Sequence, residues 1–301
     1  MMRAPNSILT DSLVSTAWLQ AHLTAPSLRV VDIRGYVRTT DLGAGRQEAD
    51  YVGARDEYEA AHIPGAVYVD WTTDITDPKS SVKAQIAPPD RFGAAMAERG
   101  IGDETDVVVV DHTGGHFATR LWWSLRFYGH DAVAILDGGY ARWIAEGWPV
   151  TSDVPRVKRG TFSPRMNPDL RVAADDVLQH VERGDALIVD ARDEEQYRGD
   201  IRRGPRGGHI PGAVNLPAKA LFGSDGSWHP VGELRRLLKD RGIDGAKPVV
   251  AYCNGGVTAT AVLFAMDRAG FGRWANYDGS WNEWGGRADY PVEMASGRGG
   301  K

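Results

Sequence analysis

The sequence predicts an α/β protein of two tandem domains with the same fold, each a mainly parallel sheet flanked by helices. The chain has 301 residues, about twice the ~150 that one domain usually takes. Short apolar runs alternate with longer amphipathic segments in both halves, which is typical of a parallel sheet covered on both faces. The two halves also share matching sequence blocks in the same order. We therefore infer an internal duplication.

The clearest repeated block is His-Ile-Pro-Gly-Ala-Val, which occurs at His62–Val67 and again at His209–Val214. Other blocks match in the same order along both halves: Leu28–Arg34 with Leu187–Arg192, Arg99–Ile101 with Arg241–Ile243, and Asp137–Gly139 with Asp278–Ser280. Each pair of blocks marks the same point in a repeating strand and helix pattern.

The expected strands are short, β-branched and bounded by turns, as buried parallel strands are. They include Val30–Val31, Val107–Val110, Val133–Leu136 and a strand that ends at Tyr252. Helical spacing predicts helices over 91–99, 119–128, 233–241 and 258–269. Prolines punctuate residues 151–171, which we interpret as the linker between domains 1–150 and 172–301.

Composition narrows the function classes. The formal net charge is −5, so nucleic acid and anionic membranes are not expected partners. No apolar run is long enough for a spanning helix or a signal peptide, so we expect a cytoplasmic protein. Cys253 is the single cysteine, which excludes an intrachain disulfide and a site built from several cysteines. No cluster of metal-ligating residues is apparent in the sequence, so we expect no metal site.

Cys253 stands where a buried strand ends, and a glycine-rich loop follows it. Such a loop at a helix N-terminus can turn backbone N–H groups inward to bind an anion, and this would favour the nucleophilic thiolate. The residues expected to hold the substrate or the modified sulfur are Asn254, Gly255, Gly256, Val257 and Thr258. We also expect Thr258 to cap the helix. The alternative is a small buried hydrophobe in a strand-to-helix turn.

The equivalent strand end of the first half carries Asp111 and His112 and no thiol. The duplication therefore predicts one catalytic half and one supporting half. For Asp111 we favour a structural polar role. Whether either residue reaches the catalytic site is left open.

Taken together, these residues resemble the tandem-domain rhodanese family of sulfurtransferases, which act on thiosulfate or 3-mercaptopyruvate. The blocks that carry the resemblance, besides the repeated blocks and the Cys253 loop, are Arg120–Trp123, Phe127–His130, Leu136–Gly139, Asp190–Arg192 and Tyr277–Gly285. The resemblance implies that the Cys253 thiolate takes a sulfur from the donor as a persulfide. It then passes that sulfur to cyanide, a thiol or a protein thiol, with no cofactor.

The sequence departs from both donor-specific patterns of that family. Thiosulfate-type loops often place basic residues after the cysteine, where this chain has the neutral Asn254 and Gly255. Gly255 stands where mercaptopyruvate-type loops have a serine, and Gln196 stands where a substrate-binding arginine is expected before Tyr197. Arg198 is the nearest replacement, and a following insertion offers Arg202, Arg203 and Arg206. The donor therefore stays open between thiosulfate and 3-mercaptopyruvate.

Several other residues have two interpretations. Arg192 either binds the donor anion or pairs internally with Asp190, as Arg34 and Asp32 would do in the first half. His62 is expected to support a turn, because the same histidine recurs in the second half. Trp281 is expected to roof the pocket or to support the core.

The sequence bears on two other function classes. Phosphatases of the same fold need an arginine at the sixth position after the cysteine, where this chain has Ala259, and the next arginine is Arg268. A phosphatase is therefore disfavoured. The other alternative is a rhodanese-like sulfur-relay or partner-binding module that turns over no small molecule.

Overall fold

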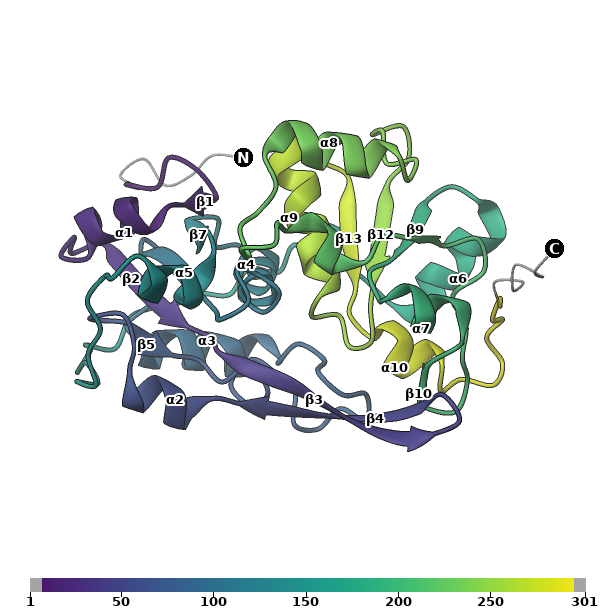
Figure 1. Ribbon diagram of the computed structural model, residues 1–301, viewed down its shortest axis with the longest axis horizontal. Coiled ribbons are helices and arrows are strands. Elements are labelled where there is room, and N and C mark those ends of the chain that lie inside the picture. Colours follow the sequence, from purple (N-terminus) through teal and green to yellow (C-terminus); the bar gives the residue numbers. More distant parts are fainter. Residues whose placement is uncertain (1–6, 295–301) are drawn as a thin grey trace.

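The computed structural model describes residues 7–294, and these form two α/β domains that lie side by side (Figure 1). Each domain contains a five-stranded sheet in which every neighbouring pair of strands is parallel. The strand orders β1-β7-β6-β2-β5 and β8-β13-β12-β9-β11 are equivalent position by position. The predicted fold class and the duplication are therefore confirmed.

The first sheet consists of β1 (Leu13–Val14), β2 (Leu28–Asp32), β5 (Val67–Tyr68), β6 (Asp106–Val110) and β7 (Val133–Leu136). Its helices are α1 (Thr16–His22), α2 (Arg55–Ala60), α3 (Pro89–Glu98), α4 (Ala118–Phe127) and α5 (Gly139–Ala145). Helices α3 and α4 pack on the face of the sheet that looks toward the second domain, whereas α1 and α5 contribute to the outer core.

The second sheet consists of β8 (Arg171–Val172), β9 (Leu187–Asp190), β11 (Val214–Asn215), β12 (Val249–Tyr252) and β13 (Trp274–Tyr277). Its helices are α6 (Ala174–Arg183), α7 (Glu194–Arg198), α8 (Val231–Lys239), α9 (Ala259–Ala269) and α10 (Ser280–Trp284), with 3-10 turns η1 (Pro168–Leu170) and η2 (Ala218–Leu221). The predicted helices agree with α3, α4, α8 and α9 to within two residues at each end.

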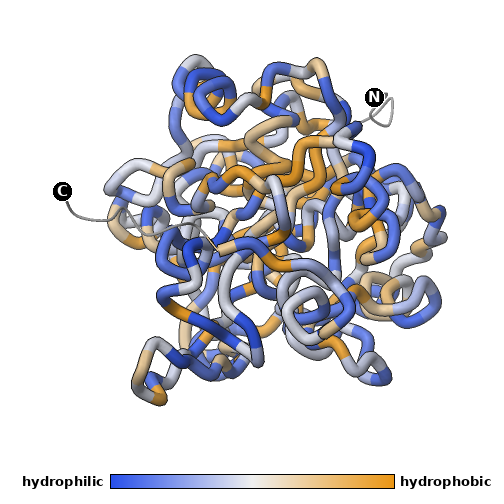
Figure 2. The backbone as a smooth tube through the Cα atoms, turned by 90° about the vertical axis from the view of Figure 1, so that its right-hand side faces the viewer, coloured by the Kyte–Doolittle hydropathy of each residue, from blue (hydrophilic) through white to orange (hydrophobic). Residues whose placement is uncertain are grey.

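Helices α4 and α9 lie in the centre of the molecule, between the two sheets. Every residue of α4 is buried, including Arg120 and Arg126, because the helix meets its own sheet on one side and the second domain on the other. The largest apolar cluster accordingly runs through both domains, and Trp122 packs edge-on against Phe264 of α9 at 5.0 Å between ring centroids. Figure 2 shows hydrophobic segments gathered in the interior of the molecule and hydrophilic segments mostly at its periphery.

A third, three-stranded sheet was not predicted. Strands β3 (Gly35–Gly43) and β4 (Arg46–Gly53) form an antiparallel hairpin that leaves the first domain and extends beneath the second (Figure 1). Strand β10 (Arg202–Arg203) of the second domain pairs with β4 and completes this sheet. The hairpin escaped sequence analysis because much of it is exposed and carries few large apolar residues.

The proline-rich stretch between α5 and η1 contains no helix and only an isolated bridge at Thr151. It is nevertheless tied to the first domain, since Gly160 donates its N–H to Ala97 and Arg165 donates its N–H to Tyr128. The boundaries of the linker, 151–171, stay a prediction.

Candidate active site

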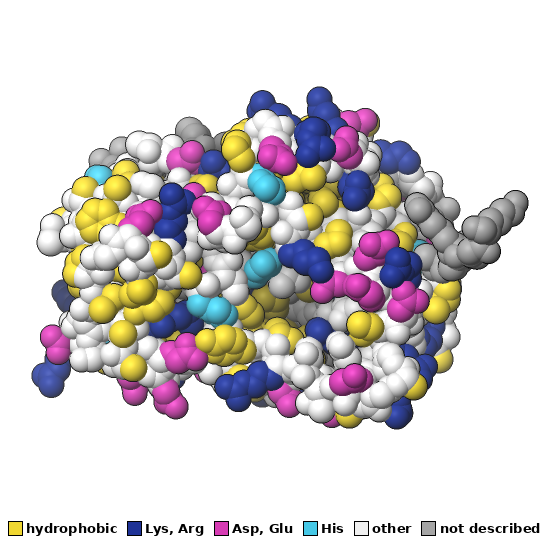
Figure 3. All heavy atoms as spheres, viewed as in Figure 1, with side chains coloured by type: hydrophobic (Ala, Val, Ile, Leu, Met, Phe, Trp, Pro, Cys, Tyr) yellow, Lys and Arg dark blue, Asp and Glu magenta, His cyan; other side chains and the backbone are white. Residues whose placement is uncertain are grey.

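A cavity of about 460 Å³ opens between the domains, and Cys253 lies in its wall. The second domain contributes the residues after β9 and β12, at the carboxyl ends of parallel strands, where open α/β sheets bind ligands. The first domain contributes the β3–β4 hairpin and the loop before α4. In Figure 3 the surface is hollowed in this region, close to a group of histidine side chains.

Cys253 directly follows β12 and is 3% exposed. Its backbone is held from both sides. Its N–H donates to the Ser280 hydroxyl at 3.1 Å, and its carbonyl accepts the Trp281 N–H at 3.0 Å. The thiol is therefore carried by a fixed backbone position at the start of the loop.

The loop after Cys253 offers unpaired hydrogen-bond donors. Gly256 has φ +69°, a left-handed conformation that turns the chain back toward α9. Within residues 7–294, the backbone N–H groups of Gly255, Gly256, Val257 and Thr258 have no acceptor. Buried backbone donors are normally paired, so this set is available to an anion attached to Cys253.

One detail of the loop differs from expectation. Helix α9 begins at Ala259, with Thr258 as its N-cap residue, but the Thr258 side chain makes no capping hydrogen bond. The Thr258 backbone is in the right-handed helical region (φ −73°, ψ −16°), whereas a capping side chain usually needs an extended backbone. The predicted cap was therefore wrong, although Thr258 does line the cavity.

The equivalent loop of the first domain has its donors filled. Asp111 follows β6, and its carboxylate accepts four backbone N–H groups, at 2.7 to 3.0 Å. The donors are Thr113, Gly115, Phe117 and Ala118. Asp111 does not line the cavity, so the structural role favoured for it agrees with its position, whereas His112 does border the cavity.

Arg192 lines the cavity, but its guanidinium is already occupied. Nη2 donates to the Asp190 carboxylate at 2.6 Å and to the Gly208 carbonyl at 2.7 Å, and both side chains of the ion pair are buried. Burial opposes the charge on Arg192, but Asp190 outweighs it and raises the pKa of Arg192. The pair has a direct counterpart in Asp32 and Arg34 of the first domain. The geometry supports the internal ion pair rather than donor binding.

Trp281 and His62 are both buried outside the cavity, where they contact neighbouring residues of the fold. The indole of Trp281 lies 4.3 Å from the Arg192 guanidinium, is 1% exposed and does not line the catalytic cavity. His62 is fully buried away from the cavity, where Nδ1 lies 2.7 Å from the Tyr58 carbonyl. In the second domain His209 has the same relation to the Tyr197 carbonyl, at 2.8 Å.

The candidate arginines behave differently from one another. Arg198 does not line the cavity and pairs with Glu194 and Asp200, so its position does not support the predicted contact with substrate. Because α7 is a regular helical turn, the residue after Tyr197 projects from another side of it. Arg206 donates to carbonyl groups at the end of α10.

Arg203 behaves differently, because it lines the cavity from β10. It is half-buried on β10, its Nε donates weakly to Gln47 at 3.4 Å, and it takes part in none of the ion pairs formed within residues 7–294. Burial lowers the pKa of Arg203, although an arginine stays charged at neutral pH. Lys219 also lines the cavity, but Asp193 binds its ammonium at 2.6 Å.

Gln196 takes a different partner from the arginine that it replaces. Its side-chain oxygen accepts a hydrogen bond from Asn254 Nδ2 at 2.9 Å, and Gln196 is buried. The residue after the cysteine is thereby held by a neutral amide pair. The Gln196–Asn254 pair itself adds no charge to the cavity, although the neighbouring Arg192 and Asp193 also line it.

Most of the first-domain wall of the cavity was not predicted from the sequence. The missed residues that line the cavity are Tyr36, Val37, Thr39, Tyr51, Trp71, His116 and Phe117. Burial lowers the pKa of His112 and of His116, so both imidazoles are neutral at physiological pH. Burial likewise raises the pKa of Tyr51, whose hydroxyl accepts a hydrogen bond from Asn282 at 3.2 Å. The wall is therefore aromatic and neutral.

In the part of the chain that the structure covers, no group of three or more histidine, cysteine or acidic side chains could hold a metal ion. No helix between residues 7 and 294 is long and apolar enough to cross a membrane.

Comparisons with known proteins place this site in a family. The family model described as Rhodanese-like domain matches residues 15–146 and again residues 173–287. The chain is 35% identical to the thiosulfate sulfurtransferase of Mus musculus over 307 residues, covering 98% of this chain and 99% of that protein. It is 34% identical to the 3-mercaptopyruvate sulfurtransferase of Escherichia coli over 287 residues, covering 94% and 98%.

The solved structures agree. The crystal structure of SseA from Escherichia coli, a 3-mercaptopyruvate sulfurtransferase with the rhodanese fold, superposes with a TM-score of 0.79 at 31% identity. The superposition covers 90% of this chain and 99% of SseA. With two matched domains, a single thiol between them and this likeness over nearly the whole length, the chain belongs to the rhodanese family.

Proposed function

We propose that the protein is a sulfurtransferase that carries sulfur on Cys253, moving it from thiosulfate or 3-mercaptopyruvate to a thiophilic acceptor. The observation that carries the proposal is the loop after Cys253, where successive backbone N–H groups lack acceptors beside the chain's single thiol. Relatives that match over nearly their whole length are named for these two donors. A cytoplasmic location and the absence of nucleic-acid partners stay predictions from composition.

The first domain supports an anionic persulfide at this position. A carboxylate oxygen of Asp111 is three bonds from its Cα, and the outer sulfur of a persulfide on Cys253 would also be three bonds from Cα. The Asp111 carboxylate receives four N–H groups of its own loop. A Cys253 persulfide anion would meet the unpaired N–H groups of the second loop, which would stabilise negative charge as an oxyanion hole does.

The first half-reaction forms one sulfur–sulfur bond and breaks one bond in the donor. With thiosulfate, the Cys253 thiolate attacks the outer sulfur, and the electron pair of the donor's sulfur–sulfur bond leaves with sulfite. With 3-mercaptopyruvate, the carbon–sulfur bond breaks, its electron pair stays on carbon, and the donor's own thiol proton completes pyruvate. Neither route consumes an external oxidant or reductant.

In the second half-reaction the acceptor attacks the outer sulfur of the persulfide, and the electron pair returns to Cys253 as thiolate. Cyanide leaves as thiocyanate, and a thiol leaves as a new persulfide. Two such steps are easier than one direct transfer because the enzyme-bound sulfur is stabilised between them.

Arg203 is the residue proposed to recognise the donor anion. Both donors are anionic, the first-domain wall is neutral, and Arg192 and Lys219 are already paired. Replacing Arg203 by glutamine should raise the KM for either donor about tenfold or more, with a smaller change in kcat, since one charge-assisted contact is lost. Arg198→Gln is the matched control, because Arg198 lies outside the cavity.

The direct test is the intact mass of reduced protein after brief exposure to each donor. The proposal expects a gain of one sulfur atom, absent from Cys253→Ser, and the faster donor defines the substrate. Wild-type protein that gains no sulfur from either donor would contradict the proposal and favour a partner-binding module.

A further inference from the structure

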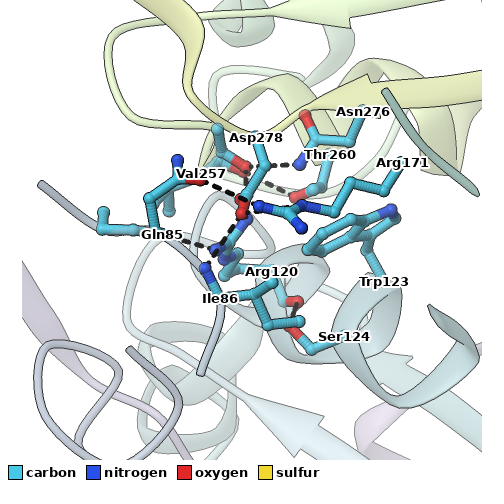
Figure 4. Close-up of polar contacts among 12 residues, drawn as sticks. Gln85, Ile86, Arg120, Trp123, Ser124, Arg171, Val257, Thr260, Asn276 and Asp278 are labelled. Atoms are coloured by element: carbon cyan, nitrogen blue, oxygen red, sulfur yellow. Dashed lines mark hydrogen bonds and ion pairs between the residues drawn. The ribbon is translucent and has the colours of Figure 1, made fainter. Parts of the chain in front are cut away.

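The thiol-less domain reaches into the catalytic loop through one side chain. Arg120 of α4 is 2% exposed, and its Nη1 donates to the Asp278 carboxylate at 2.6 Å and to the Gly256 carbonyl at 3.0 Å (Figure 4). Its Nη2 donates to the Ala84 carbonyl at 2.8 Å. Arg120 therefore joins its own domain to the loop that carries Cys253.

The Gly256 carbonyl is held by two donors, because Asn276 Nδ2 also binds it at 3.0 Å. Neither Arg120 nor Asn276 lines the catalytic cavity, so this carbonyl points away from the cavity. In a planar trans peptide the C=O and the following N–H point in opposite directions. Fixing the Gly256 carbonyl therefore directs the Val257 N–H toward the side on which Cys253 lies.

We propose that Arg120 is a positioning residue for sulfur transfer: it holds the Gly256–Val257 peptide so that the Val257 N–H faces the sulfur on Cys253. The proposal rests on the function proposed above. The first domain shows that a backbone N–H of such a loop can face the residue at the strand end, since Gly115 donates its N–H to the Asp111 carboxylate.

The clamp has no reciprocal partner. Helices α4 and α9 meet at equivalent residues, where the Thr260 and Thr119 hydroxyl groups lie 2.9 Å apart. The residue that follows Thr119 is Arg120, but the residue that follows Thr260 is Ala261, which cannot reach the Asp111 loop with a charged group. Asp111 fills its own loop and needs no such support. An interdomain arginine of this kind is therefore directed only at the loop that carries the thiol.

A second arginine of α4 forms an interdomain ion pair away from the Cys253 loop. Arg126 of α4 binds Asp267 of α9 at 2.8 Å, and its guanidinium also lies over the rings of Trp122 and Trp274. This contact is at the opposite end of α9 from the Cys253 loop. Arg126 is therefore a matched control for the general cost of losing an interdomain arginine.

The experiment compares Arg120→Lys with Arg126→Lys in the full chain. The readouts are the rate of persulfide formation at saturating thiosulfate, the half-saturating thiosulfate concentration, and the pH dependence of Cys253 alkylation by iodoacetamide. A lysine keeps a charge for Asp278 but cannot donate to Asp278, Gly256 and Ala84 together. Thermal unfolding of both variants reports the loss of packing.

The expected result for Arg120→Lys is a rate of persulfide formation lowered about ten- to hundredfold, with half-saturation changed much less. Its alkylation profile should move to higher pH, whereas Arg126→Lys keeps the wild-type rate and profile despite a lower Tm. Equal rate losses in the two variants, or wild-type kinetics in Arg120→Lys, would overturn the positioning role.

A second variant covers the case in which Arg120→Lys does not fold. Asn276→Ala removes the other donor to the Gly256 carbonyl and should slow persulfide formation in the same way, and an unchanged rate would overturn the proposal. The wild-type arm separates the two proposals. If wild-type protein forms no persulfide, the proposed function fails. If wild-type protein forms the persulfide and the variants form it at the same rate, only the positioning role of Arg120 fails.

Discussion

The loops after β6 and β12 are two versions of one structure, and they differ in what occupies their backbone donors. In the first, the Asp111 carboxylate accepts four N–H groups and closes the loop upon itself. In the second, Cys253 stands at the same strand end, and the N–H groups of residues 255–258 have no acceptor within the described part of the chain. The first loop is a satisfied anion site, and the second is such a site left open for substrate sulfur.

This contrast explains why one copy can be catalytic and the other structural. A loop with unpaired donors costs stability, and only a loop that binds a transient anion gains function from that cost. The filled copy avoids the cost, and its helix α4 carries the arginine that holds the open copy.

The greatest loss of activity is expected from adding a side chain at Gly256, whose left-handed backbone conformation forms the turn of the loop after Cys253. A Cβ at Gly256 would lie 2.6 Å from the Asp278 carbonyl oxygen, and φ is +69°. Gly256→Val should therefore slow persulfide formation about a thousandfold, because the loop can no longer direct its donors together. Rapid-quench mass spectrometry measures the rate.

The control for that variant is Gly212→Val, in the repeated turn outside the cavity. Gly212 has φ +72°, but a Cβ added at this position would have no atom within 4 Å, so only backbone strain is added. It should lower Tm without a comparable loss of rate. A Gly256→Val enzyme as fast as this control would contradict the open-loop interpretation.

Substitution of Asp111, whose carboxylate occupies the backbone donors of the first loop, should lower the stability of the protein. Asp111→Asn puts an NH₂ group against N–H donors, and it should lower the free energy of unfolding by about 3 kcal/mol. Urea titration measures this. Asp137→Asn should cost less, because the amide keeps an oxygen for the Trp228 N–H and loses only the 3.5 Å ion pair with Arg142. Equal losses would show that the four-donor arrangement contributes nothing special.

A substitution at Cys253 can turn the open loop into the filled one. Cys253→Asp places a carboxylate where the persulfide is expected, whereas Cys253→Asn has the same shape without charge. Neither variant can accept sulfur, and the Asp variant should be more stable than the Asn variant by about 1–2 kcal/mol at pH 7. A more stable Asn variant would argue against an anion site.

The weakest of these effects concerns acid. Burial lowers the pKa of His112 and of His116 in the first loop, so the fold favours their neutral forms. Below the ordinary histidine pKa of about 6.5, these two histidines are protonated in the unfolded chain but stay neutral over a wider pH range in the folded chain. Stability is therefore complete above that pH and is lost as the pH falls.

His116→Gln should remove part of this loss, roughly 0.5–1 kcal/mol between pH 7.5 and 5.5. The check is the free energy of unfolding at both pH values, for wild type and variant. The second loop has Asn254 and Thr258 in this region and gives no matching acid sensitivity. An unchanged pH dependence in His116→Gln would place the acid-sensitive groups elsewhere.

Much of this architecture could be predicted from sequence because it depends on local patterns. The β-branched runs marked the buried strands, and the Cys253 loop was recognisable as a glycine pair between a strand and a helix. The ion pair of Asp190 and Arg192, one of the two interpretations left open for Arg192, needs only two residues of one strand end, and it forms in the structure.

What escaped prediction depends on contacts between distant segments. Tyr51 reaches the cavity on a hairpin whose strands are polar and exposed, and the pairing of β4 with β10 joins residues more than 150 positions apart. Arg198 lies outside the cavity whereas Arg203 lines it, and this difference depends on the directions in which the side chains leave α7 and β10. No local pattern carries that information.

The decisive experiment is a high-resolution crystal structure of the wild-type protein loaded with sulfur from thiosulfate. We expect the outer sulfur on Cys253 to lie inside the loop, within hydrogen-bond distance of backbone N–H groups that include Val257, as the carboxylate of Asp111 lies in the first loop. An outer sulfur turned away into the cavity, with the loop N–H groups bound to water instead, would contradict the open anion site.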